Sequence, residues 1–250
     1  MDNDVLKAAT DGFSLPHDVV MLPTKGIFYN NKKNSVKVGY LTASDENFLL
    51  NNDRRDNIIM TLLRNKIYEH ELRPDELLDS DVEAILIFLR NSSFGPEYTL
   101  NLTDPVSGKQ FEHTEILDEL RVNDTEHKPD NNGCFVVKLP KTGSTVKIKP
   151  ITFFEGLELD EMAENYPKGR VAPIITWRLN KMVLEVDGSD DRNMISQFIE
   201  HLPIMDSKFI RNFIKNNVPS LNLSREVNAP SGEKVTFNVS FGVSFFRPFF

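Results

Sequence analysis

Cysteine is nearly absent from this sequence, because Cys134 is the one cysteine among 250 residues. A single cysteine excludes a disulfide framework and a multi-cysteine metal site within the chain. Such scarcity suits a reducing compartment. Cys134 would need a partnering base to act as a nucleophile. It starts a short apolar run, where cysteine usually serves as a small buried side chain.

Positive charge is also in short supply. The chain has 37 acidic and 29 basic residues, so its formal net charge is −8. An acidic chain gains nothing electrostatically from nucleic acid or from an anionic membrane surface. We therefore expect neither as a partner.

Long apolar runs are missing as well. The longest, Ala84–Leu89, falls far short of the ~20 residues that span a bilayer. The first residues, Met1–Lys7, lack the basic region and apolar run of a signal peptide. Together these features predict a soluble protein that is intracellular when made.

The motifs of common enzymes are not found. The sequence has no P-loop, no Gly-x-Gly-x-x-Gly and no Gly-x-Ser-x-Gly. Its five histidines are scattered without a second ligand at i+3 or i+4. The segment that starts with Asp187–Asp191 lacks the glycine at the sixth position and the glutamate at the twelfth position of a calcium loop. It is typical of a helix-capping turn. We therefore predict no enzyme activity, no catalytic, cofactor-binding or metal site, and no small-molecule substrate.

The most informative feature that is present is an internal repeat. Leu-Pro-Thr-Lys-Gly at 22–26 recurs as Leu-Pro-Lys-Thr-Gly at 139–143. Four further segments match in the same order. They pair 36–42 with 146–152, 56–63 with 172–179, 81–92 with 206–217, and 100–109 with 221–233. Five ordered matches indicate a duplication.

Each copy is predicted to open with a β-hairpin. Gly26 and Gly143 would supply the positive φ of its turn. Apolar residues alternate with lysine at 36–38 and 146–148, which is typical of a half-buried strand. A threonine then precedes an acid by three residues, at Thr42 and at Thr152, which predicts a capping box and a helix start.

Two or three helices follow in each copy. The periodicity predicts a helix with its apolar face from Ile58 to Ile67, and another capped by Ser80. In the second copy, one predicted helix runs from Ile174 to Val186. Each copy closes with a hairpin whose turn contains a glycine, Gly108 or Gly232.

These patterns predict an α+β fold that is internally duplicated, each copy comprising a hairpin, two to three helices and a closing hairpin. The predicted divisions are an N-terminal segment at 1–13, a first repeat at 14–122, a polar linker at 123–133 and a second repeat at 134–250. The linker has no apolar residue to bury and ends in glycine.

The second repeat ends in an aromatic tail. Strict alternation predicts a strand from Val235 to Phe245. One face of a strand does not accommodate the aromatic residues that follow. We therefore predict that Phe246, Arg247, Phe249 and Phe250 form a partner-binding element, because Phe and Arg are enriched in interface cores. The alternative is a tail that folds back onto its own core.

An ordered set of segments resembles one known family. In the first half they are Leu22–Gly26 with Phe28-Tyr29, 41–46, 80–90 and 93–98; in the second they run from Leu139-Pro140 through Thr152 to 245–248. Over residues 14–250 the chain resembles baseplate hub and hub-assembly proteins of T-even-like contractile-tailed bacteriophages.

This resemblance implies a non-enzymatic protein that helps to build the baseplate hub through contacts with other hub proteins. It implies assembly in the host cytoplasm, and it leaves open whether the chain is a virion component of the tail baseplate or an assembly factor such as a chaperone. Two alternatives remain: a small hydrolase or transferase with a site between the repeats, and a phage-encoded host-interaction protein.

Overall fold

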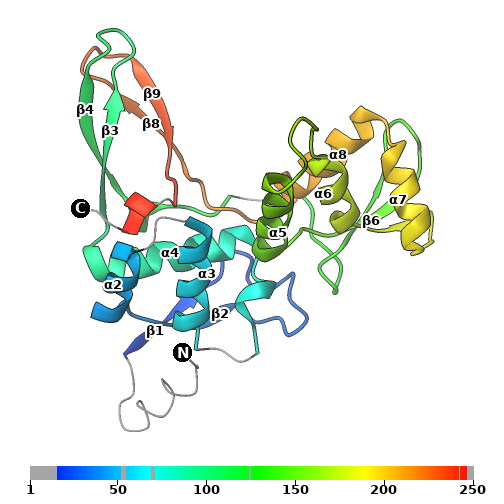
Figure 1. Cartoon of the computed structure of the whole chain (residues 1–250), viewed down its shortest axis with the longest axis horizontal. Coiled ribbons are helices and arrows are strands. Elements are labelled where there is room, and N and C mark those ends of the chain that lie inside the picture. Colours follow the sequence, from blue (N-terminus) through cyan, green and yellow to red (C-terminus); the bar gives the residue numbers. More distant parts are fainter. Residues whose placement is uncertain (1–15, 52–54, 69–70, 124, 242, 247–250) are drawn as a thin grey trace.

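The computed structural model describes residues 16–51, 55–68, 71–123, 125–241 and 243–246. The architecture is α+β: helices alternate with small antiparallel sheets of two or three strands. The opening hairpin and helices of the first half, at the lower left of Figure 1, and the helices of the second half, at the right, form two lobes.

The first half has the predicted order of hairpin, helices and closing hairpin. Its elements are β1 (His17–Met21), β2 (Ser35–Gly39), α2 (Ala43–Asn51), α3 (Arg55–Lys66), η1 (Pro74–Glu76), α4 (Asp79–Phe94), β3 (Glu97–Thr103), β4 (Gln110–Ile116) and η2 (Leu117–Glu119). β1 pairs antiparallel with β2, and β3 pairs antiparallel with β4.

The second half repeats this order with two additions, a strand and a helix, so its described residues form four helices where two to three were predicted. Its elements are β5 (Phe135–Lys138), β6 (Thr145–Ile148), α5 (Phe153–Glu164), α6 (Ile174–Met182), β7 (Val183–Val186), α7 (Arg192–Glu200), α8 (Ile204–Asn217), β8 (Ser224–Asn228), β9 (Lys234–Asn238) and η3 (Val243–Phe246). The added helix is α7, and the added strand, β7, extends the opening hairpin to a sheet of order β5-β6-β7.

Three local predictions were wrong. The helix expected over 174–186 ends at Met182, and Val183 and Val186 lie buried in β7, where β-branched side chains are favoured. Ser80 does not cap α4, whose N-cap is Leu78. The strand expected to reach Phe245 ends at Asn238.

Other local predictions were confirmed. Thr152 forms the capping box with Glu155. Asp191 accepts a hydrogen bond from the Asn193 N–H and so caps α7, as the turn at 187–191 predicted. The residues at 36–38 and at 146–148 are strands in both halves.

An aspartate at an equivalent position in each half holds the loop that follows the first strand of the opening hairpin. Asp81 and Asp206 each occupy the third position of a helix, α4 or α8, and both are 0% exposed. Asp81 accepts hydrogen bonds from the Thr24 N–H at 3.0 Å and the Thr24 hydroxyl at 2.6 Å. Asp206 accepts from the N–H groups of Lys141 at 2.8 Å and Thr142 at 2.9 Å. We call these the two aspartate clamps.

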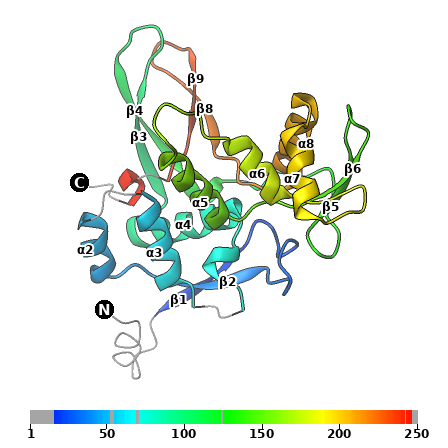
Figure 2. The same ribbon diagram turned by 45° about the vertical axis from the view of Figure 1, so that its right-hand side comes forward.

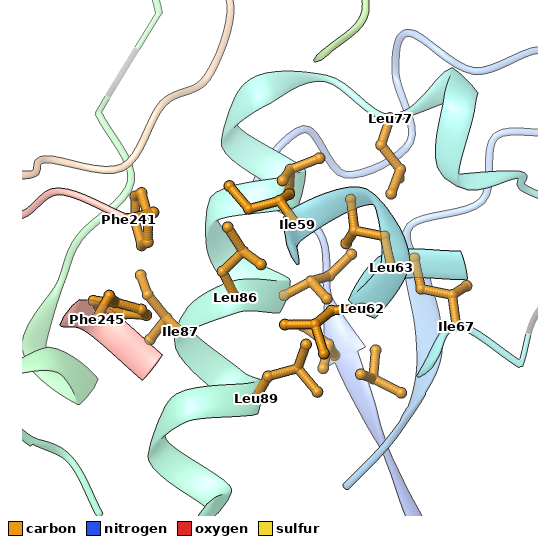
Figure 3. Packing of buried hydrophobic residues seen from close by; sticks show 14 of the residues in the cluster. Ile59, Leu62, Leu63, Ile67, Leu77, Leu86, Ile87, Leu89, Phe241 and Phe245 are labelled. Carbon is orange, nitrogen blue, oxygen red and sulfur yellow. The ribbon is translucent and has the colours of Figure 1, made fainter. Parts of the chain in front are cut away.

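Two hydrophobic clusters form the core, and they do not follow the predicted repeat boundary. One cluster joins β1, β2 and helices α3 and α4; the other joins β5–β7 with α6–α8. Phe237, Val239, Phe241, Phe245 and Phe246 belong to the first cluster. Figure 3 shows Phe241 and Phe245 beside Leu86 and Ile87 of α4. The apolar residues of 134–250 are therefore divided between the two clusters.

The linker at 123–133 lies along both halves. The Asn123 N–H donates to the Ser220 carbonyl at 2.8 Å, and the His127 N–H donates to Asn217 Oδ1 at 2.7 Å. Lys32 of the first half donates from Nζ to the Asn131 carbonyl. The polar linker is thus satisfied by backbone and side-chain hydrogen bonds in place of apolar burial.

Candidate interaction surfaces

The C-terminal segment is anchored on a buried arginine. Arg90 is 2% exposed and donates to the carbonyls of Gly95 and Glu97, each at 2.6 Å. Its guanidinium carbon lies 5.1 Å from the Tyr98 ring centre and 5.6 Å from that of Phe245. Burial lowers the pKa of Arg90. The carbonyls of Gly95 and Glu97 and two aromatic rings thus stabilise the cation.

Of the four residues predicted to form a partner-binding tail, the structure describes Phe246 alone. Phe246 is 2% exposed and packs in the first cluster, as the fold-back alternative expected, so it is not an exposed contact. Arg247, Phe249 and Phe250 lie outside the described residues. Their partner-binding role remains a prediction. These three residues follow Phe246, the last residue of η3, which is buried.

The two closing hairpins form a projecting arm. Figures 1 and 2 both show β3–β4 and β8–β9 side by side, extending from the lobes. Arg225 Nε donates to Glu115 Oε1 at 2.8 Å, and the rings of His113 and Phe237 lie 5.4 Å apart. We call this structure the arm. Its outward side chains are mostly threonine, asparagine and charged residues, so it offers a polar surface.

A buried aspartate joins the two turns at the tip of the arm. Asp104 accepts hydrogen bonds from the N–H groups of Val106 at 2.9 Å, Ser107 at 3.2 Å and, across to the other hairpin, Ser231 at 3.1 Å. Burial raises the pKa of Asp104, but these hydrogen bonds outweigh burial and lower the pKa below its ordinary value.

The four turn glycines predicted from the sequence all have positive φ: 73° at Gly26 and Gly143, 66° at Gly108 and 89° at Gly232. Gly26 is also sterically restricted, because a Cβ there would lie 2.5 Å from the carbonyl oxygens of Lys32 and Lys33. Gly143 has open space around its Cβ position.

A groove of about 940 Å³ lies at the junction of the two lobes. Its lining from the start of α4 and the linker includes the acids Asp79, Glu83 and Glu126. Its lining from α6 and α8 includes the cations Arg178, Arg211 and Lys215. The apolar lining residues are Ile151, Ile174, Ile175, Met182, Ile214 and Val218. The sequence motifs gave no signal for this groove.

The described part of the chain holds no group of three or more His, Cys, Asp or Glu side chains that could bind a metal ion. Within the same residues, every helix is too short or too polar to cross a membrane. Cys134 is buried, and burial raises the pKa of its thiol. A raised pKa disfavours the thiolate that a nucleophile requires.

Comparison with known proteins identifies the family. A family model described as T4 bacteriophage base plate protein matches residues 27–247, which is most of the chain. The chain therefore belongs to the T4 bacteriophage base plate protein family. Neither the curated proteins nor the solved structures gave a significant match.

Proposed function

We propose that the chain is a non-enzymatic protein of the baseplate hub in a contractile-tailed phage, and that it acts in hub assembly through protein–protein contacts. The observation that carries this proposal is the family match over residues 27–247. The family supports a structural role in the baseplate and contact with other phage structural proteins. The hub proteins are the proposed partners in the host cytoplasm during assembly, and the chain is either retained with them in the tail or acts only as an assembly factor.

The architecture supplies surfaces suited to that role. The arm projects from the lobes, so that it can contact a neighbouring subunit while the two cores stay intact (Figure 1). The tail continues from η3, which Arg90 and Tyr98 hold in place. We further propose that the two halves arose by duplication, because both contain an opening hairpin, an aspartate clamp and a closing hairpin in the same order.

Reconstitution with purified hub proteins of the same phage tests the proposal. We expect an affinity-tagged chain to form a stoichiometric complex with at least one hub protein in size-exclusion chromatography with light scattering. The matched control is a baseplate protein from outside the hub. Migration of the chain apart from every hub protein, at concentrations well above micromolar, would contradict the proposed role.

Mass spectrometry of purified virions then distinguishes the two forms of the proposal. A constant ratio of this chain to hub proteins in virions identifies a retained component. Its presence in hub intermediates but not in virions identifies an assembly factor. Detection in neither sample would contradict both.

A further inference from the structure

We propose that the groove between the lobes binds a phenylalanine-bearing segment of a partner chain. This inference rests on the proposed protein-binding function and adds the location and chemistry of one contact. It comes from comparing equivalent positions in the two halves, where one half has an aromatic segment seated on it and the other has an open groove.

Positions that line the groove in the second half have counterparts in the first. The two matched helix segments give the correspondence by their numbering, and the orientation of the clamp aspartates, Asp81 and Asp206, agrees with it. The equivalent pairs are Ile59 with Ile175, Leu62 with Arg178, Leu86 with Arg211, and Arg90 with Lys215. All four second-half members line the groove.

In the first half this face is covered. Ile59 and Leu86 are each 1% exposed, and Arg90 is 2% exposed. Phe241 lies with Ile59 and Leu86, and the Phe245 ring lies 5.6 Å from the Arg90 guanidinium (Figure 3). The covering segment therefore places two phenylalanines, four positions apart, over an apolar surface and one cation.

In the second half the corresponding face is open to the groove. Ile175 is 48% exposed, although its counterpart is buried. The segment that follows β9 does not return to its own lobe, because it packs in the first cluster through Val239, Phe241, Phe245 and Phe246. The second lobe thus retains the docking face, while the C-terminal segment with Phe241 and Phe245 covers the first lobe instead.

The lining of the groove favours aromatic rings. Ile175 and Ile214 provide apolar contact, and Arg211 and Lys215 can lie over ring faces as Arg90 does. Acids in the lining, Asp79 among them, disfavour a polyanionic ligand. Ser80 Oγ is buried beside the groove and has no hydrogen-bond partner among the described residues, so it can donate to the backbone of a docked segment.

A synthetic peptide with the sequence of residues 238–246 is the probe, because this segment covers the equivalent face. We measure its binding to the full chain by fluorescence anisotropy and expect saturable binding, with a Kd on the order of micromolar. A peptide with Phe241 and Phe245 replaced by alanine is the control ligand and should bind at least about tenfold more weakly.

Protein variants locate the site. Ile175→Asp and Lys215→Glu should each weaken peptide binding by about tenfold or more, without a change in Tm. Ile204→Asp and Lys208→Glu are matched controls on exposed positions of α8 that do not line the groove, and they should bind as the wild type does. Absence of saturable binding, or binding that both groove variants leave unchanged, would overturn the inference. A chain that fails here but still forms the complex with hub proteins would retain the proposed function.

Discussion

At the residue scale, the two aspartate clamps fix the conformation of the loop at Thr24 and of the loop at Lys141-Thr142. A carboxylate at 0% exposure is costly unless its oxygens are satisfied, and both clamps accept backbone hydrogen bonds from the turn that they hold. In the first half, burial raises the pKa of Asp81, while hydrogen bonds from Thr24 and Tyr29 oppose that rise. The Tyr29 hydroxyl also accepts from the Leu78 N–H at 3.1 Å.

We predict that Asp81→Ala lowers the free energy of unfolding by about 2–4 kcal/mol, because it leaves the buried Thr24 N–H without an acceptor. Asp206→Ala should cost less, about 1–2 kcal/mol, because the two residues that donate to it are exposed and water can replace the lost acceptor. Chemical denaturation monitored by circular dichroism measures the loss. Asp190→Ala is a matched control at a surface turn and should cost under about 0.5 kcal/mol. A loss at Asp81 or Asp206 as small as that of the control would show that the clamps do not stabilise the fold.

The two equivalent turn glycines should differ in their tolerance. Alanine at either position is strained by the positive φ, which costs about 1–2 kcal/mol. Gly26→Ala adds a clash with the backbone of Lys32 and Lys33, whereas Gly143→Ala adds none. We therefore expect Gly26→Ala to lower Tm more than Gly143→Ala does. Equal melting temperatures for the two variants would contradict the steric argument.

Asp104 should make the tip of the arm sensitive to acid. Because the folded pKa of Asp104 lies below its ordinary value, the ionised form stabilises the tip above the ordinary pKa, and that stabilisation is lost as pH falls through the folded pKa. Amide chemical shifts of Val106 and Ser231, followed by NMR from pH 6 to about pH 2, should move together with a midpoint below the ordinary value of 3.8. A midpoint at or above that value, or separate titration of the two amides, would contradict the bridge.

At the scale of elements, local signals predicted starts and turns better than they predicted ends. Thr152 with Glu155 predicted the start of α5, since a capping box needs only four neighbouring residues. The end of α6 is set instead by a tertiary contact, because Val183–Val186 pair with β6 as the third strand of a sheet. Helical periodicity in the sequence cannot reveal this pairing. The alternation at 235–245 predicted a buried face within the second repeat. The strand ends at Asn238, and the buried residues of this alternation lie in the first cluster: Phe237, Val239, Phe241 and Phe245.

Substitutions in the C-terminal segment should destabilise the core of the first half, which is distant in sequence. Phe245 is 0% exposed and contacts Arg90, Phe241 and Tyr98. Phe245→Ala should cost about 3–5 kcal/mol, because it leaves a cavity and removes one ring from a buried cation. Phe245→Leu is the conservative control and should cost less. An alanine variant as stable as the wild type would show that the segment does not belong to the core.

Truncation separates the anchored and predicted parts of the tail. Removal of residues 247–250 keeps the buried Phe245 and Phe246, so we expect an unchanged Tm. If Arg247, Phe249 and Phe250 bind a partner, the same truncation should weaken the complex with hub proteins. An unchanged affinity would show that the tail beyond η3 is not an interface.

At the scale of the whole molecule, the C-terminal segment links the second half of the chain to the core of the first half. The family match and the ordered internal matches come from the sequence. The packing of Phe237, Phe241 and Phe245 on the other lobe could not be predicted, because the internal matches treat each half by itself. The groove has the same origin, since it lies where this packing leaves a face of α6 and α8 uncovered. The fold class was therefore predictable, whereas the surface between the lobes was not.

Electron microscopy of particles made without this chain tests the hub assignment most directly. A phage with a stop codon early in this reading frame, grown in a non-suppressing host, should accumulate heads and incomplete baseplates that lack an assembled hub. Supplying the wild-type chain from a plasmid should restore complete tails. Intact, infectious particles in its absence would contradict the claim that this protein acts in assembly of the baseplate hub.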